Sequence, residues 1–419
     1  MKDDATINQK KINVLILTAD AGFGHRSAAN AVAAALQEAH EQECRVDIVN
    51  PLEDKRTPFF LRDSQADYDK IIRSIPQLYR IGFEASDATL PSVIVESALT
   101  VMLYEVMYDI IHKYKPDVIL NTFPIYHSAL YAVFTITRRK IPMLTVITDL
   151  STIHRLWFND HVDGYLVPNI EVRDHAIEHG VSVEKIFITG IPVHPDISRQ
   201  KKPREAIRKS LQWDPKLTTI LVVGSRRVDN LLDVLNIINH FGAPLQLAIV
   251  AGKDEVLYEQ LKTFEWHIPA HIYDFSTNIP QMMLAADCIV SKAGGLIVTE
   301  ALASGLPMIL IDVIKGQETG NADFVVESGS GDLALTPMKF LETLSHWLMD
   351  NQGLLKQRAE NAHLQGKPYS AFHVSDLLMQ AARKKVTLDA LLPKRSYLIE
   401  LLTKYQVHFQ ESILPFRKK

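Results

Sequence analysis

The segment KINVLILTADAGFGHRSAANAV, residues 11–32, contains the unit from which this chain of 419 residues is expected to be built. An apolar run typical of a strand leads into two glycines, Gly22 and Gly24, and an alanine-rich run with helical character follows. A strand, a glycine loop and a helix in this order are typical of parallel α/β sheets, where such loops usually hold phosphate. His25 stands where the helix is expected to begin, which is unusual for a phosphate loop.

Short apolar runs alternate with amphipathic segments along the whole chain. The runs are 14–17, 46–49, 118–120, 144–147 and 164–167 in the first half, and 220–223, 245–250, 270–273, 288–290 and 308–311 in the second. Strands without polar alternation are buried on both faces, as in a parallel sheet covered by helices. We therefore predict an α/β fold of two Rossmann-like, doubly wound domains that face each other across a cleft.

The domain boundary is expected within GIPVHPDISRQKKPREA, residues 190–206, because three prolines and a cluster of charge indicate a linker. The predicted parts are an N-terminal domain at 1–195 with a helical insertion at 51–115, a C-terminal domain at 196–382, and a basic helical tail at 383–419. The tail carries nine Lys or Arg against three Asp or Glu. We expect it to pack on the body of the protein; the alternative is attraction to an anionic membrane at about 1 kcal/mol per basic residue.

Composition excludes several classes of protein. The formal net charge of −4 does not favour nucleic-acid binding. Two cysteines, Cys44 and Cys288, predict no disulfide framework and fit a reducing compartment. The polar N-terminus does not resemble a signal peptide, and no uncharged stretch reads as a membrane span. We expect a cytoplasmic protein whose contact with a membrane is peripheral.

The first candidate site is the glycine loop with its histidine. A dinucleotide fingerprint would need a third glycine where Ser27 stands, although Asp47 could imitate the ribose-binding acid. A bulky ring after the second glycine would obstruct a diphosphate. Gly22 and Gly24 would instead let another substrate approach the backbone, and His25 could take a proton from a hydroxyl at neutral pH. The alternative is a histidine that only caps or packs at the helix start.

The second candidate site lies within CIVSKAGGLIVTEALASGLPMILIDVIKGQETGNADFVVESGSG, residues 288–331. A strand ends before a tight turn that contains Lys292, Gly294 and Gly295, and a helix follows. The free N–H groups at the start of a helix can bind an anion. We therefore expect a phosphate-binding turn here; the alternative is an ordinary strand–turn–helix unit.

Polar residues follow this turn at two places. Glu300 falls one to two turns into the helix, where its carboxylate could accept hydrogen bonds from the two vicinal hydroxyls of a ribose. Gln317, Glu318 and Asn321 follow the next strand and are suited to sugar hydroxyls.

These motifs resemble glycosyltransferase family 28. The segment KAGGLIVTEALASGLPMILIDVIKGQETGN resembles the family's nucleotide-sugar signature, and TADAGFGHRSAANAV resembles the acceptor-side loop of its glycolipid branch. That branch contains bacterial processive diacylglycerol glucosyltransferases and plant monogalactosyldiacylglycerol synthases. Further similar segments are YDKIIRSIPQLY at 68–79, TVITDLSTIHRLWF at 145–158 and ITGIPVHP at 188–195, and the resemblance runs from about residue 14 to 376.

The resemblance implies a GT-B fold that binds the acceptor in its N-terminal domain and a UDP-sugar in its C-terminal domain. It also implies transfer with inversion at the anomeric carbon, with no required metal and no cofactor besides the donor. The roles it implies are His25 as base, Asp149 orienting His25 or the acceptor, Glu300 at the ribose, Gln317, Glu318 and Asn321 at the donor sugar, Gly294 and Gly295 at the diphosphate, and Phe275 near the uracil.

Two positions depart from the family pattern. His194 stands where the family often has an arginine that is expected near the diphosphate. The loop VVGSRRVDN, residues 222–230, has Gly224 as its single glycine. The Ser225 amide and the charge of Arg226 or Arg227 are expected to help to stabilise the leaving group; the alternative is that the two arginines are a solvated pair. These departures indicate an altered donor or a protein that binds nucleotide sugar without efficient transfer.

We therefore expect transfer of a hexose from a UDP-sugar to a hydroxyl of a lipid, with diacylglycerol as the expected acceptor, at an anionic membrane surface. The alternatives are a UDP-sugar 2-epimerase, a transferase with a soluble acceptor, and a weakly catalytic nucleotide-sugar sensor. The sequence leaves the donor sugar open.

Overall fold

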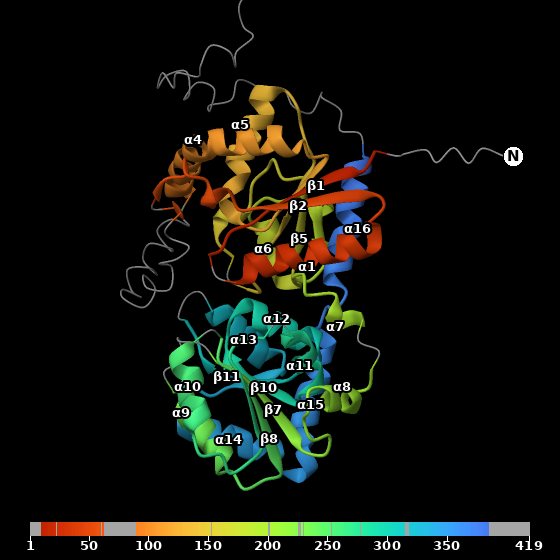
Figure 1. Cartoon of the computed structure of the whole chain (residues 1–419). Helices are drawn as coiled ribbons and strands as arrows, with labels where there is room; N and C mark the ends of the chain where they lie inside the picture. Colours follow the sequence, from red (N-terminus) through yellow and green to blue (C-terminus); the bar gives the residue numbers. More distant parts are fainter. Residues whose placement is uncertain are drawn as a thin grey trace, which may run out of the picture.

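The computed structural model describes most of the chain. The described residues are 10–21, 23–59, 61–62, 89–151, 153–199, 202–224, 228, 230–252, 254–276, 278–314 and 318–384, with the backbone alone at Phe23 and 89–95. Figure 1 shows two α/β lobes stacked one above the other. The prediction of two doubly wound domains is therefore confirmed.

The first lobe is built on a parallel sheet with the strand order β2-β1-β3-β4-β5-β6. Its strands are β1 (Ile12–Leu17), β2 (Cys44–Val49), β3 (Val118–Asn121), β4 (Met143–Val146), β5 (Gly164–Val167) and β6 (Ile186–Ile188). Successive side chains of a strand point to opposite faces. Val14 and Ile16 accordingly belong to the core under one layer of helices, and Leu15 and Leu17 to the core under the other.

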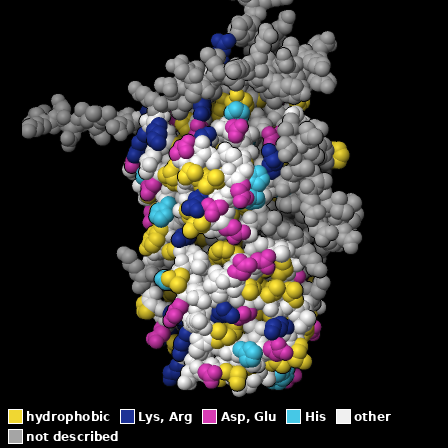
Figure 2. Space-filling view, turned by 180° about the vertical axis from the view of Figure 1, so that it is seen from behind, with side chains coloured by type: hydrophobic (Ala, Val, Ile, Leu, Met, Phe, Trp, Pro, Cys, Tyr) yellow, Lys and Arg dark blue, Asp and Glu magenta, His cyan; other side chains and the backbone are white. Residues whose placement is uncertain are grey.

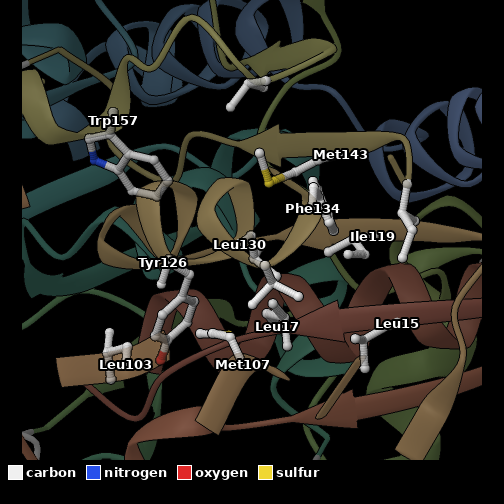
Figure 3. Packing of buried hydrophobic residues seen from close by; sticks show 14 of the residues in the cluster. Leu15, Leu17, Leu103, Met107, Ile119, Tyr126, Leu130, Phe134, Met143 and Trp157 are labelled. Atoms are coloured by element: carbon white, nitrogen blue, oxygen red, sulfur yellow. The ribbon is translucent and has the colours of Figure 1, made fainter. Parts of the chain in front are cut away.

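Helices cover both faces of this sheet. Helix α1 (Phe23–His40) lies on one face, and α4 (Thr89–Tyr114), α5 (His127–Thr137) and α6 (Ile170–Glu178) lie on the other. Figure 3 shows Leu103 and Met107 of α4 next to Leu17 and Tyr126 in the core. Helix α4 and the 3-10 turn η1 (Pro51–Glu53) belong to the expected insertion at 51–115, so its described helix packs on the core; residues 60 and 63–88 lie outside the described residues.

The second lobe is built on a parallel sheet with the order β12-β11-β10-β7-β8-β9. Its strands are β7 (Thr218–Val223), β8 (Leu245–Val250), β9 (Ala270–Tyr273), β10 (Cys288–Lys292), β11 (Met308–Asp312) and β12 (Gly331–Leu333). Its helices are α8 (Arg204–Ser210), α9 (Leu231–Asn239), α10 (Glu255–Thr263), α11 (Ile279–Ala285), α12 (Gly295–Ala303), α13 (Thr319–Glu327), α14 (Pro337–Leu348) and α15 (Gly353–Gln365). Helices α9, α10 and α14 share one core with the sheet, and α11, α12 and α13 share the other.

Both sheets reverse their strand order at one place, between β1 and β3 in the first and between β7 and β10 in the second. Ligands of open α/β sheets bind in the crevice outside the carboxyl ends of the strands at such a switch point. The loops that follow these four strands therefore mark where a site is expected.

The last described helix, α16 (Ser370–Arg383), returns to the first lobe. It lies beside α1 (Figure 1), and Val374, Leu378 and Met379 are buried in the core that contains Val14 and Ile16. Within the described residues, the chain thus passes between the lobes twice, at α7 (Asp196–Arg199) and before α16. We propose the domain boundary near residue 195 with α16 assigned by contact to the first lobe; the tail beyond residue 384 lies outside the described residues.

The two connections between the lobes lie against each other. Gly190 has a φ of +82°, and a Cβ at this position would lie 2.6 Å from Cβ of Lys367. This conformation and the lack of space both require glycine. No helix in the described part of the chain is long and apolar enough to cross a bilayer.

Candidate active site

His25 lies in the first turn of α1, at the switch point of the first sheet. Its Nδ1 is 2.7 Å from the carbonyl oxygen of Thr122, which follows β3, and 2.9 Å from Oγ1 of Thr148, which follows β4. Because a carbonyl oxygen can only accept, Nδ1–H donates to Thr122, and Nε2 keeps its lone pair. The Thr122 carbonyl therefore fixes Nε2 as the nitrogen of the ring that can act as a base.

Burial lowers the pKa of His25 to about 4, and the hydrogen bond to Thr122 offsets part of this effect. The imidazole is consequently neutral at pH 7. A neutral ring with an unprotonated nitrogen is the form that can remove a proton from a hydroxyl.

Two aromatic rings flank this imidazole. The Phe123 ring meets it edge-on with centroids 4.9 Å apart, and the Trp157 ring lies 6.1 Å away. Nε1 of Trp157 donates to Oδ2 of Asp149 at 3.1 Å. Burial raises the pKa of Asp149 to about 6, against a lowering contribution from the Trp157 hydrogen bond. Asp149 thus reaches His25 through an indole, and within the described residues the direct contacts of the ring nitrogen come from Thr122 and Thr148.

The second lobe presents the start of α12 at its own switch point. Gly294 precedes the helix and provides no side-chain cap, so the N–H groups of the first turn are available. A Cβ at Gly294 would lie 3.4 Å from Nζ of Lys292 and 3.6 Å from Oε1 of Glu318. An ammonium group and open helix amides at one place form a site suited to a diphosphate.

Glu318 and Asn321 hold this turn in place. The buried carboxylate of Glu318, whose side chain is 5% exposed, pairs with Lys292 and accepts from the Ile314 amide at 3.1 Å. Nδ2 of Asn321 donates to the carbonyl oxygen of Ala293 at 3.0 Å. Both side chains therefore join the start of α13 to the turn after β10, beside any ligand bound there.

Glu300 lies on α12, and the described residues provide no hydrogen bond for its carboxylate. Burial raises its pKa to about 7. A buried carboxyl group without a partner costs stability and marks a candidate ligand site.

The two lobes meet at Thr148. A Cβ at Gly295 would lie 3.4 Å from the carbonyl oxygen of Thr148, and α1 contacts α12. Thr148 thus touches both the imidazole of the first lobe and the helix start of the second.

Two predicted residues lie apart from this cluster. His194 is paired with Asp196 at 3.4 Å, and its neighbour Val193 packs on Ala303, at the far end of α12 from Gly295. That helix has nine residues, so its ends are about 12 Å apart. Phe275 follows β9 and is 51% exposed.

The remaining predicted positions are glycines and residues outside the described part. A Cβ at Gly224 would meet Val250 O at 3.2 Å, and one at Gly252 would meet Gly224 O at 2.9 Å, so Gly224 lets two strand ends pack together. No described atom lies within 4 Å of the Cβ position of Gly24. The predictions for Gly22, Ser225, Arg226, Arg227 and Gln317 concern residues outside the described ranges.

Thr148 and Trp157 belong to the site but were not predicted individually. Both lie in the segment 145–158, whose resemblance to the family was the available signal. Among the described residues, no group of three or more His, Cys, Asp or Glu side chains could hold a metal ion. A cavity of about 460 Å³ between α13, β12, α14 and α15 contains none of the predicted site residues.

Comparison with known proteins identifies relatives of both lobes. The model of the family described as "Monogalactosyldiacylglycerol (MGDG) synthase" matches residues 25–193, and that described as "Glycosyltransferase family 28 C-terminal domain" matches 219–371. The chain is 32% identical to the chloroplastic monogalactosyldiacylglycerol synthase of Spinacia oleracea over 393 residues, which cover 89% of this chain and 73% of the relative.

Solved structures match over most of the chain. MurG of Acinetobacter baumannii has a TM-score of 0.57 at 17% identity and covers 88% of this chain and 99% of its own. UDP-GlcNAc 2-epimerase from Neisseria meningitidis, bound to UDP-GlcNAc, has a TM-score of 0.57 at 14% identity and covers 88% and 100%. These likenesses show the fold, and the predicted GT-B architecture is confirmed.

Proposed function

Since the chain belongs to the monogalactosyldiacylglycerol synthase branch of glycosyltransferase family 28, we propose that it transfers a galactosyl group from UDP-galactose to the free hydroxyl of diacylglycerol. The choice of galactose, which the sequence left open, rests on the names of the relatives. The observation that supports the reaction is the neutral His25, whose Nδ1 is held by Thr122 and Thr148 so that Nε2 stays unprotonated, on a loop where Thr148 also touches the open start of α12.

The proposed reaction is a single displacement. The acceptor oxygen attacks the anomeric carbon of galactose. The bond between this carbon and the β-phosphate oxygen breaks, and UDP leaves with the electron pair. Nε2 of His25 takes the hydroxyl proton. Attack from the face opposite the leaving group inverts the anomeric centre. The products are the glycolipid, UDP and a proton.

Fixed charges and dipoles of the protein would stabilise the charges that develop on UDP and on His25 during this step. The amides at the start of α12 and the ammonium group of Lys292 would stabilise the diphosphate, which is how we propose that the reaction proceeds without a metal. Asp149, ionised above a pKa of about 6, would stabilise the imidazolium formed at His25 through the indole of Trp157. Glu300 would accept from the ribose hydroxyls.

The acceptor resides in a bilayer, so we propose peripheral contact with an anionic membrane. On the face drawn in Figure 2, basic and acidic side chains of the described residues are interspersed. We propose that the tail at 383–419, whose sequence has an excess of positive charge, is attracted to the anionic membrane surface.

The test measures UDP release from UDP-galactose, UDP-glucose and UDP-N-acetylglucosamine, with and without liposomes that contain diacylglycerol. Release that requires both UDP-galactose and diacylglycerol supports the proposal, and proton NMR of the product reports the anomeric configuration. Donor turnover without lipid would favour an epimerase or a soluble acceptor, and saturable binding without turnover would favour a sensor. His25→Ala should lower kcat about 100- to 10,000-fold without weakening UDP binding.

A further inference from the structure

Thr148 touches the two halves of the site with two different groups. Its hydroxyl lies 2.9 Å from Nδ1 of His25, and its carbonyl oxygen lies 3.4 Å from the position of a Cβ at Gly295. The residue is 6% exposed and lies two positions beyond the end of β4.

The hydroxyl adds a constraint that Thr122 alone does not provide. The Nδ1–H group donates to the Thr122 carbonyl at 2.7 Å and has Oγ1 of Thr148 as a second acceptor. One acceptor fixes the tautomer, whereas two acceptors on different loops also fix the tilt of the ring. The tilt decides where the lone pair of Nε2 points, and therefore which acceptor oxygen it can reach.

The carbonyl links this constraint to the second lobe. Gly295 is the first residue of α12 and lacks a side chain, so the Thr148 backbone approaches the helix end where a diphosphate would bind. A shift of α12 relative to the first lobe must therefore alter the contact with Thr148. The hydroxyl on the same residue would carry that shift to the imidazole.

We propose that Thr148 is a positioning residue that couples docking of the donor-binding lobe to the orientation of His25. The inference rests on the proposed function of His25 as the base. Thr148 need not touch either substrate to do this. It acts through the ring nitrogen on one side and through the backbone of the nucleotide cradle on the other.

The first experiment compares Thr148→Val with Thr148→Ser. Valine keeps the branched shape and removes the acceptor oxygen, whereas serine keeps the oxygen. We expect Thr148→Val to lower kcat about 10- to 100-fold while KM for UDP-galactose stays within about twofold, and Thr148→Ser to recover most of kcat. A rise in KM without loss of kcat, or no recovery in Thr148→Ser, would overturn the proposal.

The second experiment separates action through His25 from a general packing role. In a His25→Ala background, Thr148→Val should have no further effect on the residual rate, because the ring through which it acts is absent. Loss of the residual rate by the same factor as in the wild type would assign Thr148 a merely structural role.

A readout without turnover keeps failure of the inference distinct from failure of the proposed function. ¹⁵N NMR of histidine-labelled protein should show His25 protonated at Nδ1, with a resonance that shifts in Thr148→Val and returns toward the wild-type position in Thr148→Ser. An unchanged resonance in Thr148→Val refutes the positioning role, whatever the enzyme transfers. If Thr148→Val shows the shifted resonance but the wild type shows no lipid-dependent UDP release, the proposed function alone is refuted.

Discussion

Replacing Glu300 by Gln tests the nucleotide site through protein stability, without any substrate. Burial raises the pKa of this carboxyl group from its ordinary value of 4.5 to about 7. Between these two values the folded protein binds more protons than the unfolded chain, so the group lowers stability progressively as the pH rises from 4.5 to 7. At about 1.4 kcal/mol per pH unit, the cost reaches about 3 kcal/mol above pH 7.

Glutamine has the same shape and carries no charge, so it avoids this cost. We expect Glu300→Gln to be more stable than the wild type by about 1 to 3 kcal/mol at pH 8, with the difference vanishing near pH 4.5. Urea unfolding of the free protein at several pH values measures it. Glu360→Gln makes the same charge change at an exposed position of α15 and serves as the control.

The same variant should bind UDP more weakly. A carboxylate that accepts from two ribose hydroxyls contributes about 1 to 3 kcal/mol, so the Kd for UDP should rise about 5- to 150-fold in titration calorimetry. A stability difference that does not depend on pH would refute the account of burial. Unchanged affinity for UDP would refute the ribose contact, even if the stability result held.

Three further predictions concern other parts of the site and its support. Asp149→Asn should lower kcat about 10- to 100-fold at pH 8 and remove the fall in kcat that we expect for the wild type below about pH 6, because the variant cannot ionise beside Trp157; a pH profile that still falls below pH 6 contradicts this. Lys292→Met should destabilise the protein by about 3 kcal/mol, because it leaves the Glu318 carboxylate buried without its cation, and adding Glu318→Gln should recover most of the loss. Urea unfolding checks this, and equal stability of the single and double variants argues against the pairing. Leu378→Ala should cost about 2 to 5 kcal/mol by opening a cavity between α16 and the first sheet, with a loss near zero as the contrary result.

The architecture could be predicted because buried parallel strands have a local signature. The runs at 14–17 and 220–223 lie within β1 and β7, and the glycine turns after β1 and β10 stand at the two switch points. His25 could be singled out because an imidazole directly after two closely spaced glycines is a local departure from a phosphate loop.

The partners of these residues could not be predicted, because each depends on the meeting of distant segments. Thr148 is more than 120 positions from His25, and its carbonyl meets Gly295 on the other lobe. Without those contacts Thr148 is one of many threonines near a strand end. Its acidic neighbour Asp149 was predicted instead, because the resemblance of the segment 145–158 to the family implies a role for it.

The position of α16 was missed for a related reason. An amphipathic helix shows which of its own faces is buried, and not which sheet will cover it. Leu378 and Met379 would have fitted a second-lobe core equally well by their spacing. Only the packed structure assigns them to the first sheet.

The double passage between the lobes has a mechanical consequence. Because the segment at Gly190 lies against Lys367, the two segments that connect the lobes run side by side and form a narrow double connection. A double connection of this kind permits the lobes to bend about the line that joins the two segments, and it resists rotation of one lobe against the other around the long axis of the molecule. Opening to admit a nucleotide sugar is therefore expected to follow a single arc, which returns α12 to the same register beside α1 at every turnover.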